Sequence, residues 1–198
     1  MWTLLPSLCL FAFITAFTPG PNNFLLASSG SQFGLRQTWR HIIGIRVGVS
    51  GLILLSAAGV GVLLQAYPLA YTALKYVGFA YMSWLAIKLI LAGDNLHKSH
   101  AAKPLTCLQA ALFQLGNVKA WAASLTVVAT YTLPSLYWVS VLWILAAFTV
   151  TGVLCNLCWA GMGKAASRYL DTPRKIRTFN YSLSGLTFAT ILPVLFQA

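Results

Sequence analysis

Residues 4–27 read LLPSLCLFAFITAFTPGPNNFLLA, and this run identifies the environment in which the chain folds. It holds enough apolar residues for a helix to cross the hydrocarbon core of a bilayer, which takes roughly 20. Its segment Pro19-Gly20-Pro21 interrupts the run. Each proline lacks an N–H, and its ring displaces the carbonyl four residues earlier, here that of Thr15 or Phe17. We therefore expect a helix that ends near Phe17 and a second helix that starts at Pro21, because proline suits the first helical turn.

A helix break at membrane depth points to a binding site. Backbone groups without partners are tolerated there only inside protein or against a water-filled cavity. The new helix start offers free N–H groups at Asn22, Asn23 and Phe24 and the positive end of the helix dipole, which suit a carboxylate. The freed carbonyls of Thr15 and Phe17 suit a cation. The alternative is a kink that serves only helix packing.

The composition of the whole chain agrees with a membrane environment. Of 198 residues, 59% are hydrophobic and 8% are charged, whereas about a quarter of the residues of a soluble domain are charged. The same values exclude disorder, which needs low hydrophobicity and high charge. Thirteen Lys and Arg residues face only two acids, Asp94 and Asp171, for a net charge of +11. In a soluble protein this charge would suggest nucleic-acid binding; here it indicates membrane topology, and no nucleic-acid partner is expected.

Five further apolar runs follow, so we expect an all-α membrane protein with six transmembrane helices in one transporter domain embedded in the lipid bilayer. The first run is expected to be a span and not a signal peptide, because Met1-Trp2-Thr3 contains no basic residue and no small-residue cleavage signal follows. The predicted spans are Leu4–Ala27, Ile42–Gln65, Tyr67–Leu91, Ala110–Leu133, Leu136–Met162 and Phe179–Phe196.

The basic residues orient these spans. All of the thirteen except Lys75 belong to the first, third and fifth connections or to the spans beside them. Because basic residues gather on the cytoplasmic side, these connections are expected in the cytoplasm and both termini outside. Three spans on each side of the third connection suggest a 3+3 inverted repeat. Its first half covers 1–92, its cytoplasmic connection 93–108 and its second half 109–198.

A second interruption, Gly116-Asn117-Val118-Lys119-Ala120, lies early in the fourth span. Lys119 is about ten residues from the start of that span, roughly 15 Å along a helix axis. An ionisable residue inside a span is by default a candidate for function. Interruptions in the corresponding first spans of two inverted halves are the pattern of a transporter binding site. The alternative is that the span begins near Ala120 and Lys119 is an interfacial anchor.

Several other residues have both a functional and a structural interpretation. Arg46 lies near the start of the second span. In the functional interpretation it binds a carboxylate, and in the structural one its side chain extends to the lipid headgroups. Trp121, Tyr81 and Trp84 have the same two interpretations. Their rings either bind a substrate ammonium by cation–π attraction or are aromatic residues of the helix interior or the membrane interface. Asn156 needs a partner, either a neighbouring helix or the substrate. Gly44, Gly48 and Gly51 lie on one helix face and are expected to allow close packing.

The cysteines and the known enzyme motifs suggest no catalytic chemistry. Cys155 and Cys158 have redox-like spacing but lie in an apolar helix, where packing between helices is the simpler interpretation. No acidic ligand or pair of histidines accompanies them, so neither a metal nor a cofactor is expected. The sequence contains no dinucleotide or phosphate loop and no Ser/His/Asp set with a usable acid. A transporter is therefore the preferred interpretation. A thiol-redox carrier, an intramembrane enzyme and an assembly factor are kept as alternatives.

With these residues in view, the chain resembles the lysine exporter (LysE/RhtB) superfamily of bacterial amino-acid exporters. The resemblance rests on Thr18-Pro19-Gly20-Pro21-Asn22, on Phe33-Gly34-Leu35-Arg36 and on residues 74–81, LKYVGFAY, with Trp84 following. Where many members have Asn-Pro-Lys, this chain has Asn117-Val118-Lys119. That variant, together with Pro21-Asn22-Asn23 and Asn156-Leu157-Cys158-Trp159, looks most like the cysteine/O-acetylserine efflux branch. The resemblance implies a bacterial inner-membrane protein that exports a small amino acid, driven by the proton gradient.

The scarcity of acids narrows the substrate. An amino acid's carboxylate has candidates in the N–H groups after Pro21 and in Lys119, but its ammonium meets no acid within the spans. Small neutral amino acids are therefore expected, and alternating access between the two halves moves them. For proton coupling the candidates are Lys119, His41, which is expected in or near a cytoplasmic loop, and the substrate itself. The candidate substrate-binding residues are Thr15, Phe17, Pro19, Gly20, Pro21, Asn22, Asn23, Asn117, Lys119, Trp121 and Asn156.

Overall fold

The computed structural model describes residues 2–60, 66–94 and 104–192, and in this part every regular element is a helix. The prediction of an all-α chain is confirmed there. Three short 3₁₀ turns, Trp2–Leu4, Pro134–Leu136 and Ser167–Tyr169, accompany the α-helices. The α-helices are α1 (Leu5–Phe17), α2 (Pro21–Ala57), α4 (Pro68–Asp94), α5 (Cys107–Gly116), α6 (Val118–Tyr131), α7 (Tyr137–Ala166) and α8 (Pro173–Ile191).

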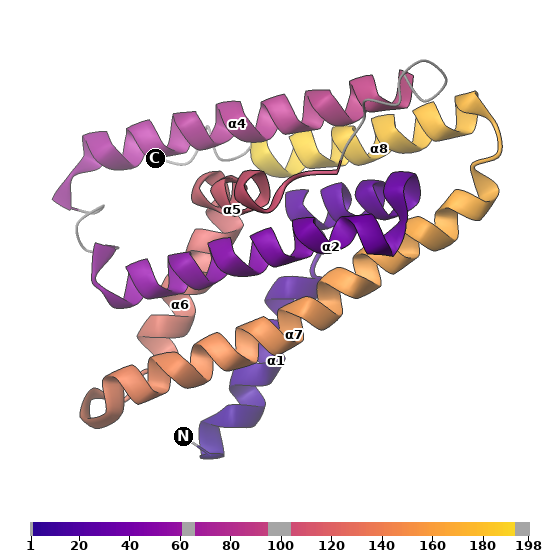
Figure 1. The fold of residues 1–198 in the computed structure, drawn as a ribbon. Helices are drawn as coiled ribbons and strands as arrows, with labels where there is room; N and C mark the ends of the chain where they lie inside the picture. The colour runs from indigo at the N-terminus through magenta and orange to yellow at the C-terminus, as the bar shows by residue number, and fades with distance from the viewer. Residues whose placement is uncertain (1, 61–65, 95–103, 193–198) are drawn as a thin grey trace.

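Helix α2 corrects the first two predicted spans. It continues from Pro21 through residues 28–41, which the sequence suggested to be a connection. At Gly34 the backbone turns with φ +71 and ψ 172, a conformation that favours glycine because other residues would clash there. The two arms fold back on each other (Figure 1), and the hydroxyls of Ser29 and Thr38 are 2.9 Å apart across the bend. The connection is therefore a helical hairpin, and Arg36 and Arg40 lie on its second arm.

The remaining spans agree with the structure to different degrees. The fourth is split into α5 and α6, as the interruption at Asn117 predicts, and the fifth and third correspond to α7 and α4. Helix α8 begins earlier than expected, at Pro173, because the Thr172 side chain accepts a hydrogen bond from the N–H of Lys175 and caps the helix. Two helical segments, Pro21–Ala57 and Pro134–Tyr169, are long and apolar enough to cross a membrane. The end of the second span (61–65), most of the 93–108 connection (95–103) and the end of the sixth span (193–198) lie outside the described residues.

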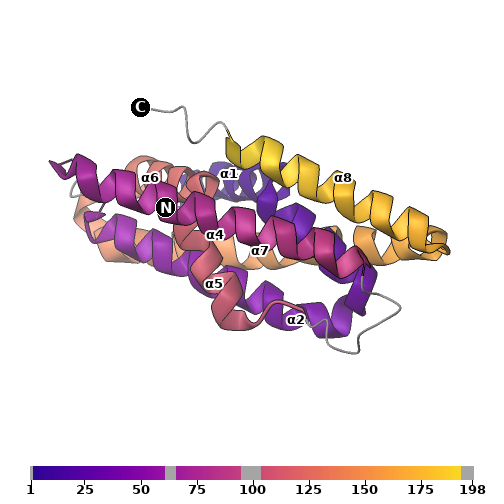
Figure 2. The same ribbon diagram turned by 90° about the horizontal axis from the view of Figure 1, so that it is seen from above.

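Helix α2 occupies the centre of the molecule. It packs along α7 on one side and against α5 on another, while α4 and α8 lie side by side across the top of Figure 1. Figure 2 shows the same pair from above, with α4 and α8 running over the other helices. Leu8, Ile53, Val127 and Ile144, from α1, α2, α6 and α7, form one fully buried apolar cluster. In this arrangement the α5–α6 break at Gly116 and Asn117 is buried, and at the α1–α2 break Gly20 is buried while Thr18 and Pro19 are exposed.

Small residues allow the helices of this core to approach closely. A Cβ atom at Gly30 of α2 would lie 2.0 Å from the carbonyl oxygen of Ala160, and one at Gly163 of α7 would lie 1.8 Å from that of Ala27. Gly44 and Gly48 make the same kind of contact with α5, as predicted. The prediction is wrong for Gly51, whose Cβ position has no neighbour within 4 Å.

Gly163→Ala is expected to destabilise the protein. Its added methyl would meet the backbone carbonyl of Ala27, which cannot move without shifting α2, and overpacking of this kind costs about 1–3 kcal/mol. The measurement is the midpoint of thermal unfolding in detergent. Gly161→Ala on the same helix is the matched control, because no atom lies within 4 Å of its added methyl. Equal midpoints for the two variants would contradict the close contact between α2 and α7.

Candidate functional site

The first break has the geometry that two prolines predict. Helix α1 ends at Phe17, Gly20 is extended with φ −178 and ψ 175, and α2 starts at Pro21. The N–H groups of Asn23 and Phe24 both donate to the carbonyl of Gly20, at 3.0 and 3.1 Å. The expectation that these two amides are free for a ligand is therefore wrong, because the first turn of α2 uses them itself.

The second break forms without a proline. Asn117 leaves the helical conformation with φ −85 and ψ 94, and its side-chain oxygen accepts a hydrogen bond from the N–H of Ala120 at 3.4 Å. Asparagine is a strong N-cap residue, and this bond satisfies one of the orphan donors of α6. A Cβ at Gly116 would lie 2.4 Å from the Cα of Gly78, so α4 and α5 meet backbone to backbone beside the break.

Three carbonyl groups at the first break, those of Ala16, Phe17 and Thr18, already have partners. The side-chain amide of Asn23 donates to the carbonyls of Ala16 and Thr18, at 3.0 and 2.9 Å. The indole of Trp159 donates to the carbonyl of Phe17 at 3.2 Å. These contacts hold the end of α1 against α2 and α7, and they satisfy backbone groups that the break would otherwise leave without partners.

Lys119 joins the two breaks. Its ammonium nitrogen Nζ donates to the carbonyl of Thr18 at 2.5 Å and lies 3.5 Å from the carbonyl of Pro19. Its stem packs against Gly20, where a Cβ would lie 3.4 Å from Lys119 Cδ. A cation from the second break thus occupies the carbonyls of the first. This contact disfavours the alternative that Lys119 is only an interfacial anchor.

A cluster of three amide side chains joins the same two segments. Asn22 Nδ2 donates to Gln114 Oε1, and Gln114 Nε2 donates to Asn22 Oδ1, both at 3.1 Å. Asn117 Nδ2 also donates to Gln114 Oε1, at 3.2 Å. Sequence analysis missed Gln114, which is fully buried. The sequence did contain an indication of its role: Gln114 is a polar residue inside an apolar span, one helical turn before Asn117, and such a residue needs a partner.

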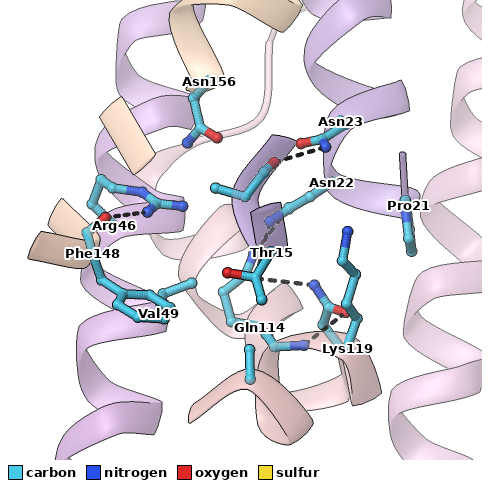
Figure 3. Close-up of a pocket in the computed structure, with 15 residues that line it drawn as sticks. Thr15, Pro21, Asn22, Asn23, Arg46, Val49, Gln114, Lys119, Phe148 and Asn156 are labelled. Carbon is cyan, nitrogen blue, oxygen red and sulfur yellow. Dashed lines mark hydrogen bonds between the residues drawn. The ribbon is translucent and has the colours of Figure 1, made fainter. Parts of the chain in front are cut away.

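These groups line a pocket between α1, α2, α5, α6 and α7 (Figure 3). The cavity measures about 60 Å³, room for about two water molecules, whereas pockets for small ligands usually measure about 300–1,000 Å³. The lining residues are Thr15, Ala16, Gly20, Pro21, Asn22, Asn23, Arg46, Val49, Gln114, Asn117, Lys119, Ala120, Ala123, Phe148 and Asn156.

The pocket holds two cations and neither of the two acids. Arg46 lines it instead of extending to the headgroups, and its Nη1 donates to the carbonyl of Phe148 at 3.1 Å. Asp94 is the last residue of α4. Asp171 lies between α7 and α8, where its carboxylate pairs with Lys175 at 2.8 Å and the hydrogen bond holds the pKa of Asp171 below its ordinary value. Among the described residues that line the pocket, its positive charge therefore meets no carboxylate.

Four of the predicted site residues do not line the pocket. Pro19 contributes only its carbonyl, which faces Lys119, and Phe17 packs on Trp159 with ring centroids 6.2 Å apart. The Trp121 indole donates to the carbonyl of Leu115 at 2.8 Å. His41 is buried in α2, with 1% of its surface exposed, so its placement in or near a loop is wrong. The cause is the helical hairpin, which carries residue 41 into the interior.

The fold and the site together define a class of protein. Apolar helices surround a small polar pocket formed where two helices break, and this architecture is typical of membrane transporters. The family model described as LysE type translocator matches residues 13–192, and the chain belongs to this family. It is therefore a multi-pass inner-membrane translocator of an efflux family, and its family and relatives are transporters, not enzymes.

Curated relatives cover most of the chain. The cysteine/O-acetylserine efflux proteins of Escherichia coli O139:H28 (strain E24377A / ETEC), of Escherichia coli strain K12 and of Shigella sonnei strain Ss046 are each 35% identical to it over 170 residues. Each of these alignments covers 84% of this chain and 85% of the relative. No solved structure matches the chain.

Proposed function

We propose that this translocator exports small neutral amino acids or their derivatives, of the cysteine/O-acetylserine kind, across the bacterial inner membrane. The names of the relatives support this substrate class. The observation that carries the proposal is the contact of the Lys119 ammonium with the carbonyl of Thr18, which joins the two breaks. A site that already holds an ammonium on backbone carbonyls suits the ammonium of an amino acid.

Substrate binding requires movement at this site. The cavity of about 60 Å³ is too small for an amino acid, so side chains that line it must move aside. In the proposed mechanism the substrate ammonium takes the place of Lys119 Nζ at the carbonyls of Thr18 and Pro19. Lys119 then leaves these carbonyls but stays beside the bound substrate, and the amides of Asn22, Asn117 and Asn156 orient the rest of the molecule.

The displacement of Lys119 links binding to alternating access. Because Lys119 belongs to α6 and its acceptors belong to the end of α1, releasing the contact frees two segments from each other. In the proposal these segments belong to two inverted three-helix halves, residues 1–92 and 109–198, joined by the cytoplasmic connection 93–108. Both termini then lie outside, as the distribution of basic residues indicates.

Protons are the proposed coupling ion. The spans contain no acid to carry a proton, so a change of charge at Lys119 on substrate binding is the proposed route. His41 is the second candidate, but it lies away from the pocket lining. The contact of Lys119 with the carbonyls of Thr18 and Pro19 supports it as the coupling residue.

The substrate class is tested by counterflow. Purified protein in proteoliposomes loaded with one unlabelled amino acid is expected to accumulate labelled L-cysteine or O-acetyl-L-serine. L-lysine and L-arginine are expected to compete poorly, because their extra cation would meet Lys119 and Arg46 with no carboxylate to offset it. Liposomes without protein are the control. Counterflow of lysine or arginine at the rate of cysteine would contradict the proposed selectivity.

A further inference from the structure

Arg46 lines this pocket with its hydrogen-bonding capacity largely unused among the described residues. A guanidinium carries five N–H donors, and the structure gives Arg46 one acceptor, the carbonyl of Phe148. Its Nε is buried and has no hydrogen-bond partner. A buried donor without an acceptor costs free energy, and a charged one costs more. The interior position of Arg46 therefore needs an explanation other than helix packing.

The facing helix is shaped to admit the guanidinium. A Cβ at Gly152 of α7 would lie 1.6 Å from Arg46 Nη1 and 2.5 Å from Arg46 Cζ. Any residue other than glycine there would displace the side chain. One turn further along α7, Asn156 lines the same pocket, is 2% exposed, and has a side-chain nitrogen with no hydrogen-bond partner. Two donor groups that lack acceptors thus come from α2 and α7 to one region.

This region is separate from the carbonyls that hold Lys119. Figure 3 shows Arg46 and Asn156 on one side of the pocket and Lys119 on the other, with Asn22 and Gln114 between them. Acceptors gather on the Lys119 side, where the carbonyls of Thr18 and Pro19 face the ammonium. Unsatisfied donors gather on the Arg46 side. The pocket is therefore polarised, with one side suited to a cation and the other to an anion.

We propose that Arg46, with Asn156 beside it in the space that Gly152 leaves, binds the carboxylate of the substrate. This inference rests on the proposed function, since it assigns one end of the amino acid to one side of the pocket. A carboxylate supplies the acceptors that the guanidinium lacks, in a geometry that a guanidinium matches with two parallel N–H donors. It also supplies a counter-charge that none of the described lining residues supplies. The substrate ammonium then lies toward the carbonyls of the first break.

The test compares a carboxylate with its amide. Inhibition of labelled L-cysteine counterflow by unlabelled L-cysteine and by L-cysteinamide, both kept reduced, yields a ratio of half-inhibitory concentrations. Wild-type protein is expected to prefer the carboxylate by roughly 10- to 100-fold, as for one charged hydrogen-bonded contact. In Arg46→Gln the ratio is expected to fall to within about threefold of unity, because the remaining amide cannot distinguish the two groups by charge. A merely structural role would lower the rate and leave the ratio unchanged.

Gly152→Ala supplies a second variant that keeps the arginine. Its methyl group would push the guanidinium from its place, so the preference for the carboxylate is expected to fall at least several-fold although no charge is lost. Gly161→Ala on the same helix, with no atom within 4 Å of the added methyl, is expected to keep the wild-type ratio. If Arg46→Gln does not fold, Gly152→Ala decides the question.

The outcomes separate the two proposals. A wild-type ratio in both Arg46→Gln and Gly152→Ala, or in Gly152→Ala alone where Arg46→Gln does not fold, would overturn the assignment of the carboxylate to Arg46 and leave the proposed export intact. Wild-type protein that neither transports nor is inhibited by L-cysteine and O-acetyl-L-serine would overturn the proposed function, and the carboxylate assignment with it.

Discussion

Lys119→Gln is expected to slow transport by roughly 10- to 100-fold, the loss that accompanies one hydrogen bond to a charged group. Lys119 is the contact between the broken α5–α6 segment and the carbonyls of Thr18 and Pro19 at the end of α1. Glutamine is shorter and uncharged, so it cannot hold both carbonyls or meet the substrate as a cation. The measurement is the initial rate of counterflow in proteoliposomes, with the amount of inserted protein determined for each variant.

The same variant tests proton coupling. Wild-type uptake is expected to respond to an imposed pH gradient, and Lys119→Gln is expected to lose this response because the spans contain no acid to replace the lysine. Lys164→Gln is the matched control: it removes one positive charge from the exposed last turn of α7, outside the pocket. An equal response to the gradient in wild type and Lys119→Gln would refute coupling through Lys119.

Asn22→Ala and Gln114→Ala are each expected to lower transport by about tenfold, and the double variant by much less than the product. Each single change removes both hydrogen bonds of the pair, and a typical hydrogen bond is worth about 0.5–1.5 kcal/mol. The double change removes both members of the reciprocal pair, whose two hydrogen bonds are 3.1 Å long. A double-mutant cycle in counterflow rate therefore yields a coupling free energy between α2 and α5.

A second cycle supplies the control for this pair. Asn180 is a buried asparagine of α8, within hydrogen-bond distance of Ser28 and Gln32 but absent from the pocket lining. Asn22→Ala combined with Asn180→Ala is expected to be additive, because the two side chains share no partner. Additivity of Asn22 with Gln114 as well would mean that their hydrogen bonds do not matter for transport.

Local sequence signals predicted the breaks more accurately than the connections. Proline chemistry located the end of α1 and the start of α2, and the glycine and asparagine before Lys119 located the break before α6. The prediction that residues 28–41 form a connecting loop was wrong. It rested on the polar and basic residues there, which instead lie on the two arms of a helical hairpin around Gly34. That error also placed His41 outside the core, although it is among the most buried side chains.

The binding groups were predicted unevenly for a related reason. Asn22, Asn23, Asn117 and Lys119 stand at the breaks, so their position in the sequence identified them. Gln114 and Arg46 stand inside regular helices, where sequence analysis missed one and left the other open. A polar residue inside a helix faces either a pocket or the lipid headgroups, depending on which helix packs against it. The local sequence does not contain that information.

The membrane class, the two helix breaks and the scarcity of acids follow from the sequence by itself, because each depends on the chemistry of neighbouring residues or on composition. The pairing of the breaks depends on the tertiary structure: Lys119 meets the carbonyl of Thr18 across 101 residues, and Asn22 meets Gln114 across 92. The position of the Arg46 side chain also depends on the tertiary structure. The packing of α7 on α2 places Gly152 next to the guanidinium, where a larger residue would clash with it. Local chemistry sets where a helix ends, but the groups that its end faces are set by how the helices pack.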